Sequence, residues 1–395
     1  MGLAGAILWI ALACLPGAGL AVPDMPRGMG IVLAQEDGQI IYSRNAEQCF
    51  VPASTLKVFT ALAALDHFGP DYRFPVKASY DPVSQDLYIR GMGDPIFISE
   101  AIDLLARNLI RHFHLESVRH IILDNGYFSP DIQIPGTGNS RNPYDATTGA
   151  LCANFNTIAF QWNAERKRFV SPEPQTPAPQ GMFLTPVRAS GQKRGRILLS
   201  PRLQALYPGF LIQHYLEQSG VRVTGTFQTG TFPSQAQSIH IVESPYPMTE
   251  VVRKLLKYSN NFIANQLMLT MGAQRQGEPA QLDKGMVVLK EFARRMGLED
   301  VSLAEASGLS RKNRITPVQM LKILSAFRPY IHLLRETPEE FYKTGTLSNV
   351  RSRVGFIKGR NKKKYPFVVF LNQQTKGYEK IMADLIQRIH RLESN

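Results

Sequence analysis

The chain has 395 residues, of which 44% are hydrophobic and 19% are charged. This length and balance exclude a largely disordered chain and leave room for two domains with a sizeable core. The formal net charge is +13, but the basic residues are dispersed, and the densest run, residues 358–364, is typical of a hairpin tip. The charge therefore gives no reason to predict a nucleic-acid partner.

The N-terminal segment is typical of an export signal. Residues 3–21 form an apolar run that ends in small residues, and we expect residues 1–21 to be removed. No Lys or Arg precedes the apolar run, so an uncleaved anchor is the alternative; after cleavage no transmembrane span is expected. Cys49 and Cys152 then permit one disulfide without requiring it. The sequence has no CxxC pair or Cys/His cluster, so no metal and no cofactor are predicted.

The mature chain is predicted to begin with a β-hairpin followed by a helix. Residues 29–34 and 39–43 flank Asp37-Gly38, a turn sequence typical of hairpins. A helix is expected from Ser54, with Pro52 just before it. Its apolar face is formed by Val58, Ala61, Leu62 and Leu65.

The middle of the chain gives weaker signals. Short strands are predicted over residues 76–95, and Ser99 is expected to cap a helix. Residues 118–123 are typical of a buried strand. In the following hundred residues, which are rich in Pro, Gly, Ser, Thr and Arg, only short strand-like pieces such as 196–199 and 221–227 stand out.

Helical patterns return near residue 245. The predicted elements are helices at 249–258, 262–271, 282–296 and 317–326, strands at 343–349, 352–358 and 366–372, and a terminal helix. Residues 316–319, Thr-Pro-Val-Gln, are a capping box with proline at the first helical position, which predicts the start of the helix at 317–326. Because strands lie at both ends of the chain, we predict an α/β fold of the α+β kind, with one antiparallel sheet flanked by helices. This domain is discontinuous, formed by residues 22–73 plus 245–395, and residues 74–244 form an inserted, mostly β domain.

Three short motifs can together build a serine acyl-transfer site. They are Ser54-Thr55-Leu56-Lys57, Ser259-Asn260-Asn261 and Lys343-Thr344-Gly345-Thr346. Each motif is weak alone, since residues 190–193 also read S-x-x-K and residues 43–45 and 140–142 also read S-x-N. Only the combination, in this order and context, predicts the chemistry.

The first two motifs supply a nucleophile and its proton transfers. The i, i+3 spacing places Ser54 and Lys57 on one helix face, so that the amine can deprotonate the hydroxyl. Desolvation and the nearby Lys343 both disfavour the charged ammonium, so the pKa of Lys57 is expected to be lowered. Between two helices, Ser259 can relay a proton to the leaving group, and Asn261 can fix Lys57 and hold a substrate carbonyl.

The third motif is predicted to be an edge strand that binds substrate. A peptide can lie antiparallel to it while Lys343 and Thr344 hold a terminal carboxylate. Gly345 permits the close approach of the peptide. The backbone N–H groups of Ser54 and Thr346 are predicted to form an oxyanion hole.

With these motifs the chain resembles the peptidase S13 family of D-alanyl-D-alanine carboxypeptidases and endopeptidases, the PBP4-type, class C low-molecular-mass penicillin-binding proteins. The resemblance covers nearly the whole mature chain. It rests on residues 42–46, 51–57, 91–95, 124–128, 154–157, 259–264, 307–311, 313–317 and 343–347. Two features depart from the family pattern: the insertion is shorter than in many members, and Asn260 stands where Asp is often found.

The resemblance implies a β-lactamase/transpeptidase-like domain and a periplasmic, cell-wall-associated hydrolase. It implies cleavage of D-Ala-D-Ala ends or cross-links of peptidoglycan peptides through an acyl-enzyme on Ser54, with β-lactams as inhibitors. The alternatives are a β-lactamase or esterase with the same site, distinguished by fast deacylation, and a wall-binding scaffold without turnover. The sequence leaves open the balance between carboxypeptidase and endopeptidase action, the stem-peptide specificity and the oligomeric state.

Overall fold

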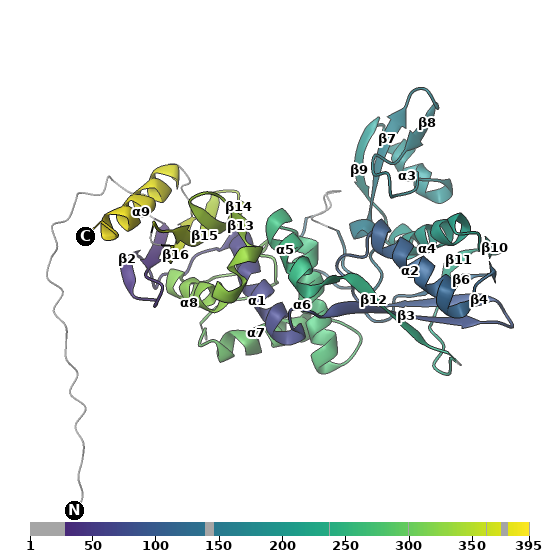
Figure 1. The fold of residues 1–395 in the computed structure, drawn as a ribbon, viewed down its shortest axis with the longest axis horizontal. Coiled ribbons are helices and arrows are strands. Elements are labelled where there is room, and N and C mark those ends of the chain that lie inside the picture. Colours follow the sequence, from purple (N-terminus) through teal and green to yellow (C-terminus); the bar gives the residue numbers. More distant parts are fainter. Residues whose placement is uncertain are drawn as a thin grey trace, which may run out of the picture.

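A computed structural model describes residues 28–138, 146–236, 238–298, 300–360, 362–372 and 378–394. The predicted export segment, residues 1–21, lies outside the described residues. Within the described ranges, no helix combines the length and the apolar character needed to span a bilayer. The chain folds into two lobes that lie side by side along the long axis of the molecule (Figure 1).

The first lobe is built on a six-stranded sheet with the strand order β13-β14-β15-β16-β1-β2. The strands are β1 (Met29–Ala34), β2 (Ile40–Arg44), β13 (Arg335–Glu336), β14 (Glu340–Leu347), β15 (Val350–Lys358) and β16 (Lys364–Asn372). Each neighbouring pair is antiparallel. The sheet thus unites the N-terminal hairpin with the C-terminal strands, which confirms the predicted fold class.

Helices cover both faces of this sheet. They are α1 (Lys57–Phe68), α5 (Met248–Tyr258), α6 (Asn261–Gln276), α7 (Leu282–Arg295), α8 (Pro317–Phe327) and α9 (Tyr378–Leu392), with the 3-10 segments η1 (Ala53–Leu56) and η5 (Arg328–Leu333). Successive side chains of a strand point to opposite faces. Phe367 and Val369 of β16 therefore pack with Leu385 of α9, while Val368 and Phe370 join the core that contains α1 and α8.

The predicted helices of the second half are confirmed with small shifts of their ends. The start of α8 has the predicted capping box: the Thr316 hydroxyl accepts from the Gln319 N–H at 3.2 Å, and the Gln319 side chain accepts from the Thr316 N–H at 2.9 Å. Pro317 occupies the first turn, where its missing N–H costs nothing. Residues close together in the chain therefore mark where this helix begins.

The second lobe contains a five-stranded mixed sheet with the order β11-β6-β4-β3-β12. Its strands are β3 (Arg73–Asp81), β4 (Asp86–Gly91), β6 (Ile121–Asp124), β11 (Phe227–Thr229) and β12 (His240–Pro247). Smaller strands are β5 (Ser117–Val118), β7 (Thr157–Asn163), β8 (Arg168–Val170), β9 (Arg194–Leu198) and β10 (Arg222–Val223). Figure 1 shows β3 and β12 running between the two lobes. The domain boundaries at residues 73/74 and 244/245 stay a prediction.

Helices cover one face of this second sheet. They are α2 (Ser99–Phe113) and α4 (Pro201–Gln218), whereas the short helix α3 (Leu184–Ala189) lies beside β7, β8 and β9 (Figure 1). Short 3-10 segments lie at η3 (Ala153–Asn156) and η4 (Gly181–Phe183). The long helix α4 is absent from the sequence prediction, because Pro208 and Gly209 interrupt its helical pattern. A Cβ at Gly209 would lie 2.6 Å from Phe227 Cβ, so the glycine permits close packing on β11. The predicted strand at 118–123 is in fact two strands, β5 and β6, with a break between them.

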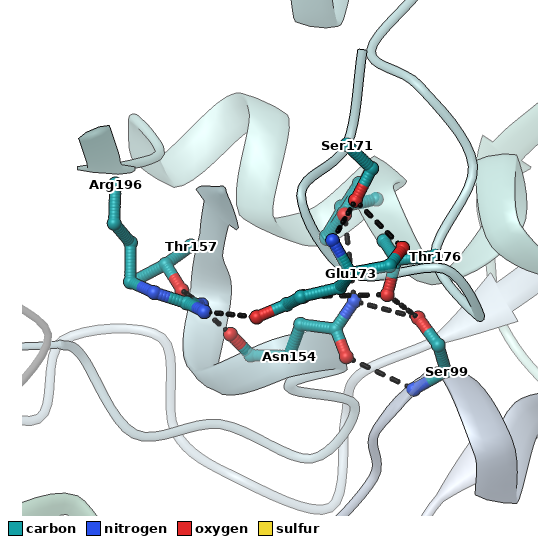
Figure 2. Close-up of polar contacts among 8 residues, drawn as sticks. Ser99, Asn154, Thr157, Ser171, Glu173, Thr176 and Arg196 are labelled. Atoms are coloured by element: carbon teal, nitrogen blue, oxygen red, sulfur yellow. Dashed lines mark hydrogen bonds and ion pairs between the residues drawn. The ribbon is translucent and has the colours of Figure 1, made fainter. Parts of the chain in front are cut away.

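The predicted cap of α2 is also wrong. Ser99 is the first residue of the helix, and its N–H donates to Asn154 Oδ1 at 2.9 Å. The Ser99 hydroxyl contacts Asn154 Nδ2 at 2.9 Å and the Thr176 hydroxyl at 2.8 Å, as Figure 2 shows. This polar cluster holds the η3 turn, from which Phe155 packs edge-on against Phe262 with ring centroids 5.8 Å apart. The turn therefore attaches the second lobe to the first turn of α6.

The two cysteines of the described chain are free thiols. Cys49 is exposed and Cys152 is buried. The disulfide that the sequence permits is therefore not formed in this structure.

Candidate active site

The first motif lies where the chain passes from the sheet into α1. Ser54 lies in the 3-10 turn η1, and α1 begins only at Lys57. The prediction placed Ser54 in the first turn of an α-helix; in a 3-10 turn, side chains three residues apart eclipse each other even more closely. Lys57 Nζ lies 3.0 Å from Ser54 Oγ. The prediction that Ser54 and Lys57 lie on one helix face is thus confirmed, but Ser54 lies in a 3-10 turn and not in an α-helix.

Lys57 is fully buried and has three polar partners. Its Nζ contacts Asn261 Oδ1 at 2.7 Å, the Ser307 carbonyl at 2.6 Å and the Ser54 hydroxyl. The two carbonyl oxygens can only accept hydrogen bonds, whereas a hydroxyl can also donate. The charged amine can donate to all three oxygens, whereas in the neutral amine two N–H groups bind the carbonyls and the lone pair is left to accept the proton of Ser54.

The electrostatic environment favours that neutral form. Burial, with a smaller contribution from the Lys343 cation, lowers the pKa of Lys57 well below its usual value, and Glu305 opposes the shift. The direction agrees with the prediction from the sequence.

The second motif lies at the junction between α5 and α6. Ser259 ends α5 in the left-handed conformation, with φ of 53°. Asn260 is the N-cap of α6, and its side chain accepts from the Ile263 N–H at 3.2 Å. Asn261 is then the first residue of α6 and reaches Lys57. The sharp change of direction at Ser259 turns its hydroxyl toward Lys343, with 2.8 Å between Oγ and Nζ.

The third motif lies on β14. The Lys343 side chain is buried, and its Nζ also donates to the Thr344 carbonyl at 2.6 Å. Burial lowers the pKa of Lys343 to about 8. Thr344 and Thr346 are exposed on the strand. On one side β14 pairs with β15 along its length, but on the other β13 pairs only with Phe341 and Tyr342. The stretch from Lys343 onward is therefore open to an added strand.

Gly345 brings β14 against the serine segment. A Cβ at this position would lie 2.7 Å from the Ser54 backbone nitrogen and 2.9 Å from the Pro52 carbonyl oxygen. Such contacts are too short for any side chain, so only glycine fits without displacement. The Ser352 hydroxyl of β15 donates to the Pro52 carbonyl at 2.6 Å and fixes the same segment. The three motifs are thus in direct contact around Ser54.

Two groups near Lys57 carry no role in the sequence prediction. One is the Ser307 carbonyl described above. The other is Glu305, a fully buried carboxylate that receives five hydrogen bonds. The donors are Asn265 Nδ2, Ser307 N, Ser307 Oγ, Ser310 N and Asn313 Nδ2. Five converging donors match the acceptor sites of a carboxylate, which organises the loop that presents Ser307 to Lys57.

The sequence signal for this loop is modest. Residues 307–311 contribute to the family resemblance, but a backbone carbonyl has no side-chain signature. Gly308 has φ of 81° and packs against the Ala53 carbonyl, which marks the loop as a close neighbour of η1. Among the described residues, no three His, Cys, Asp or Glu side chains are grouped so that they can hold a metal ion.

The fold and these contacts define a serine acyl-transfer enzyme, and comparison with known proteins gives its family. The model of the D-Ala-D-Ala carboxypeptidase 3 (S13) family matches residues 19–184 and 186–330, so the chain belongs to this family. This membership confirms the resemblance drawn from the motifs. The matched range ends before β14.

Individual relatives are distant but similar along most of their length. A D-alanyl-D-alanine carboxypeptidase of Actinomadura sp. (strain R39) is 23% identical over 83% of this chain and 74% of its own. Penicillin-binding protein 4 of Haemophilus influenzae has a crystal structure with TM-score 0.67 and 20% identity, covering 93% of this chain and 96% of that one. A predatory peptidoglycan endopeptidase of Bdellovibrio bacteriovorus superposes with TM-score 0.57 at 17% identity, covering 92% of each chain; it is also known acylated by penicillin G.

Proposed function

We propose that this protein is a periplasmic serine D,D-peptidase that cleaves D-Ala-D-Ala bonds of peptidoglycan peptides through an acyl-enzyme on Ser54. The observation that carries the proposal is the 3.0 Å contact between the buried Lys57 amine and the Ser54 hydroxyl, in a site where the other two partners of the amine are carbonyl oxygens. Family membership supports the substrate class. The acylation of the Bdellovibrio relative by penicillin G supports inhibition by β-lactams.

In the first half-reaction, Ser54 Oγ attacks the carbonyl carbon of the penultimate D-Ala while its proton passes to Lys57. The oxyanion accepts hydrogen bonds from the backbone N–H groups of Ser54 and Thr346, which Gly345 allows to lie close together. The C–N bond then breaks. The proton held by Lys57 passes through the Ser259 hydroxyl to the leaving amine, so that Lys57 is neutral again, and the peptide remains as an ester on Ser54.

Substrate binding uses the open edge of β14. The peptide adds antiparallel to the strand, with Asn261 on its carbonyl and Lys343 and Thr344 on the terminal carboxylate. In the second half-reaction, water takes the place of the amine, with Lys57 again as base. The ester is hydrolysed and Ser54 regains its proton.

The test is labelling with a fluorescent penicillin. Ser54→Ala is expected to abolish the label, and Lys57→Ala to slow labelling by at least about a hundredfold. Ser190→Ala and Lys193→Ala are matched controls from the second S-x-x-K sequence, which begins at the half-buried end of α3 and continues into an exposed loop, and both should label normally. Retained labelling of Ser54→Ala would contradict the proposal.

The lifetime of the adduct separates the remaining alternatives. A penicilloyl adduct that persists for minutes agrees with a peptidase, whereas release within seconds identifies a β-lactamase. Mass spectrometry of muropeptides provides the direct assay, since loss of one alanine from pentapeptides reports carboxypeptidase action. Normal labelling without any peptide cleavage would identify a scaffold.

A further inference from the structure

An unusual backbone conformation marks the η3 turn of the second lobe. Three consecutive residues, Asn154, Phe155 and Asn156, have positive φ angles of 47°, 58° and 57°. Asparagine tolerates this left-handed region, whereas a bulky residue adopts it rarely and with strain. Strained residues persist only where the surrounding structure fixes them, and they gather at functional sites. Phe155 is therefore the residue of this turn whose conformation needs an explanation.

Buried polar contacts on both sides of Phe155 fix its backbone. On one side, the Asn154 side chain is hydrogen-bonded to the N–H and the hydroxyl of Ser99, each at 2.9 Å (Figure 2). On the other side, Asn156 Nδ2 donates to the Thr147 carbonyl, also at 2.9 Å. The turn is thus fixed within the second lobe, while the Phe155 ring packs on α6 of the first lobe.

The Phe155 ring contacts α6 next to a site residue. It lies edge-on against the ring of Phe262, with 5.8 Å between the ring centroids, and Phe262 is buried. Phe262 directly follows Asn261, whose Oδ1 lies 2.7 Å from Lys57 Nζ. The strained turn therefore supports the first turn of α6 at the point where the Asn261 side chain leaves it.

A second turn of the predicted insertion contacts the loop that carries Ser307. Residues 134–137 form a β-turn that is closed by a 3.2 Å backbone hydrogen bond. Pro135 is its second residue and Gly136 its third, with φ of 91°, as type II turns prefer. A Cβ at Gly136 would lie 2.9 Å from both the nitrogen and the Cα of Ser310. The turn therefore packs directly on the Ser310 backbone, and a side chain at position 136 would displace one of the two.

These two contacts reach the two carbonyl partners of Lys57. The N–H groups of Ser310 and Ser307 both donate to the Glu305 carboxylate, at 3.2 and 2.6 Å. A shift of Ser310 thus acts on the same loop that presents the Ser307 carbonyl to the amine, while the other partner is Asn261 Oδ1. Each acceptor lies on an element that a turn of the second lobe supports.

We propose that the second lobe positions the general base of the reaction. Phe155 holds one carbonyl acceptor of Lys57, on α6, and Gly136 holds the other, on the loop organised by Glu305. With both acceptors in place, the neutral amine keeps its lone pair toward the Ser54 hydroxyl. The inference rests on the proposed function and adds a task for the predicted insertion: Phe155 and Gly136 are positioning residues that act through the acceptors.

The experiment removes each contact and pairs each variant with a control. Phe155→Ala is compared with Phe169→Ala, which removes an equally half-buried ring that packs against Phe160 at 5.7 Å in the same lobe. Gly136→Ala is compared with Gly38→Ala, because Gly38 has the same φ of 91° but an added Cβ there would meet no atom of the described residues within 4 Å. The strain of the backbone is thus equal, and only the contact with Ser310 differs.

Each purified full-length enzyme is acylated with a fluorescent penicillin at a series of concentrations and pH values. The limiting acylation rate of Phe155→Ala and of Gly136→Ala should fall by about tenfold, since a misplacement of about 1 Å can cost about a hundredfold. The half-saturating penicillin concentration should change less than about twofold, because the base is disturbed and the β14 edge is not. The acidic limb of the pH–rate profile should move to lower pH, because the ammonium form of Lys57 loses an acceptor.

Thermal unfolding of all variants separates positioning from packing. A purely structural role would lower the unfolding temperature and leave the acylation rate and the pH profile of the folded enzyme unchanged, which would overturn the inference. Controls that slow acylation as much as their partner variants would overturn it as well. Phe155→Leu, which keeps an apolar side chain against Phe262, should show the same changes to a smaller degree and replaces the alanine variant if that one does not fold.

The proposed function is tested separately in the same assay. If the wild type is acylated and the Phe155 and Gly136 variants behave like their controls, only the inference on the second lobe fails. Absence of acylation in the wild type would instead refute the proposed function itself.

Discussion

Replacement of Glu305 by glutamine tests how the site is held together. The carboxylate receives three hydrogen bonds at Oε2 and two at Oε1, with lengths from 2.6 to 3.3 Å. Glutamine has the same shape but only one acceptor oxygen. If that oxygen replaces Oε2, the Ser310 N–H and Asn313 Nδ2 are left facing an NH₂ group.

The magnitude follows from those two donors. A buried donor without a partner costs about 1–3 kcal/mol, so the Glu305→Gln variant should lose about 2–6 kcal/mol of unfolding free energy. That is a large part of the roughly 5–15 kcal/mol by which proteins are usually stable. Glu339→Gln, at an exposed position of the same chain, is the matched control and should change stability by less than about 0.5 kcal/mol.

The variant should also change the chemistry of Lys57. Glu305 raises the pKa of Lys57, so its neutralisation lowers that pKa further. Because acylation requires the neutral amine, the acidic limb of the pH–rate profile for acylation should move to lower pH. The assays are urea unfolding and the pH dependence of penicillin labelling. Unchanged stability together with an unchanged pH profile would refute the role given to Glu305.

Three further predictions concern other parts of the site. The pKa of Lys343 is about 8, so the cation is lost as the pH rises through 8, and the KM for a peptide with a free terminal carboxylate should rise there; a peptide amide should show no such rise. Gly345→Ala should slow acylation by about a hundredfold, because its Cβ displaces the Ser54 N–H from the oxyanion; labelling at the wild-type rate would contradict this. Cys152 is buried with its pKa raised to about 12, so mass-spectrometric mapping should find native protein alkylated at Cys49 and not at Cys152, and modification of both thiols without denaturant would refute the packing described.

Local patterns in the sequence predicted much of the first lobe. The Asp37-Gly38 hairpin, the capping box at Thr316 and the apolar C-terminal strands each depend on residues close together in the chain. The six-stranded sheet followed from them because strands at both chain ends have few other partners. These elements match the structure within a few residues.

Features that depend on distant residues were missed. Asn154 caps α2 from 55 residues away, so Ser99, a good local candidate, is not the cap. The helix α4 contains Pro208 and Gly209, which local propensity disfavours and which packing on β11 compensates. Glu305 is joined to Asn265 across 40 residues, and no spacing rule connects them. The contact of Ser259 with Lys343 spans 84 residues and was anticipated only because the three motifs were considered together.

The charges of the buried site explain why its two lysines can have different tasks. The amines of Lys57 and Lys343 and the carboxylate of Glu305 are all buried in the core of the first lobe. Two adjacent cations in such a buried site are unfavourable. Neutralising one lysine leaves a single cation near a single anion. Lys57 is the one that becomes neutral, because complete burial, together with the Lys343 cation, lowers its pKa well below the usual value. Lys343, with a pKa of about 8, keeps its charge at neutral pH and is free to attract a carboxylate. The burial of each amine and the charges around it, more than the amine itself, thus determine which lysine acts as base and which binds the substrate.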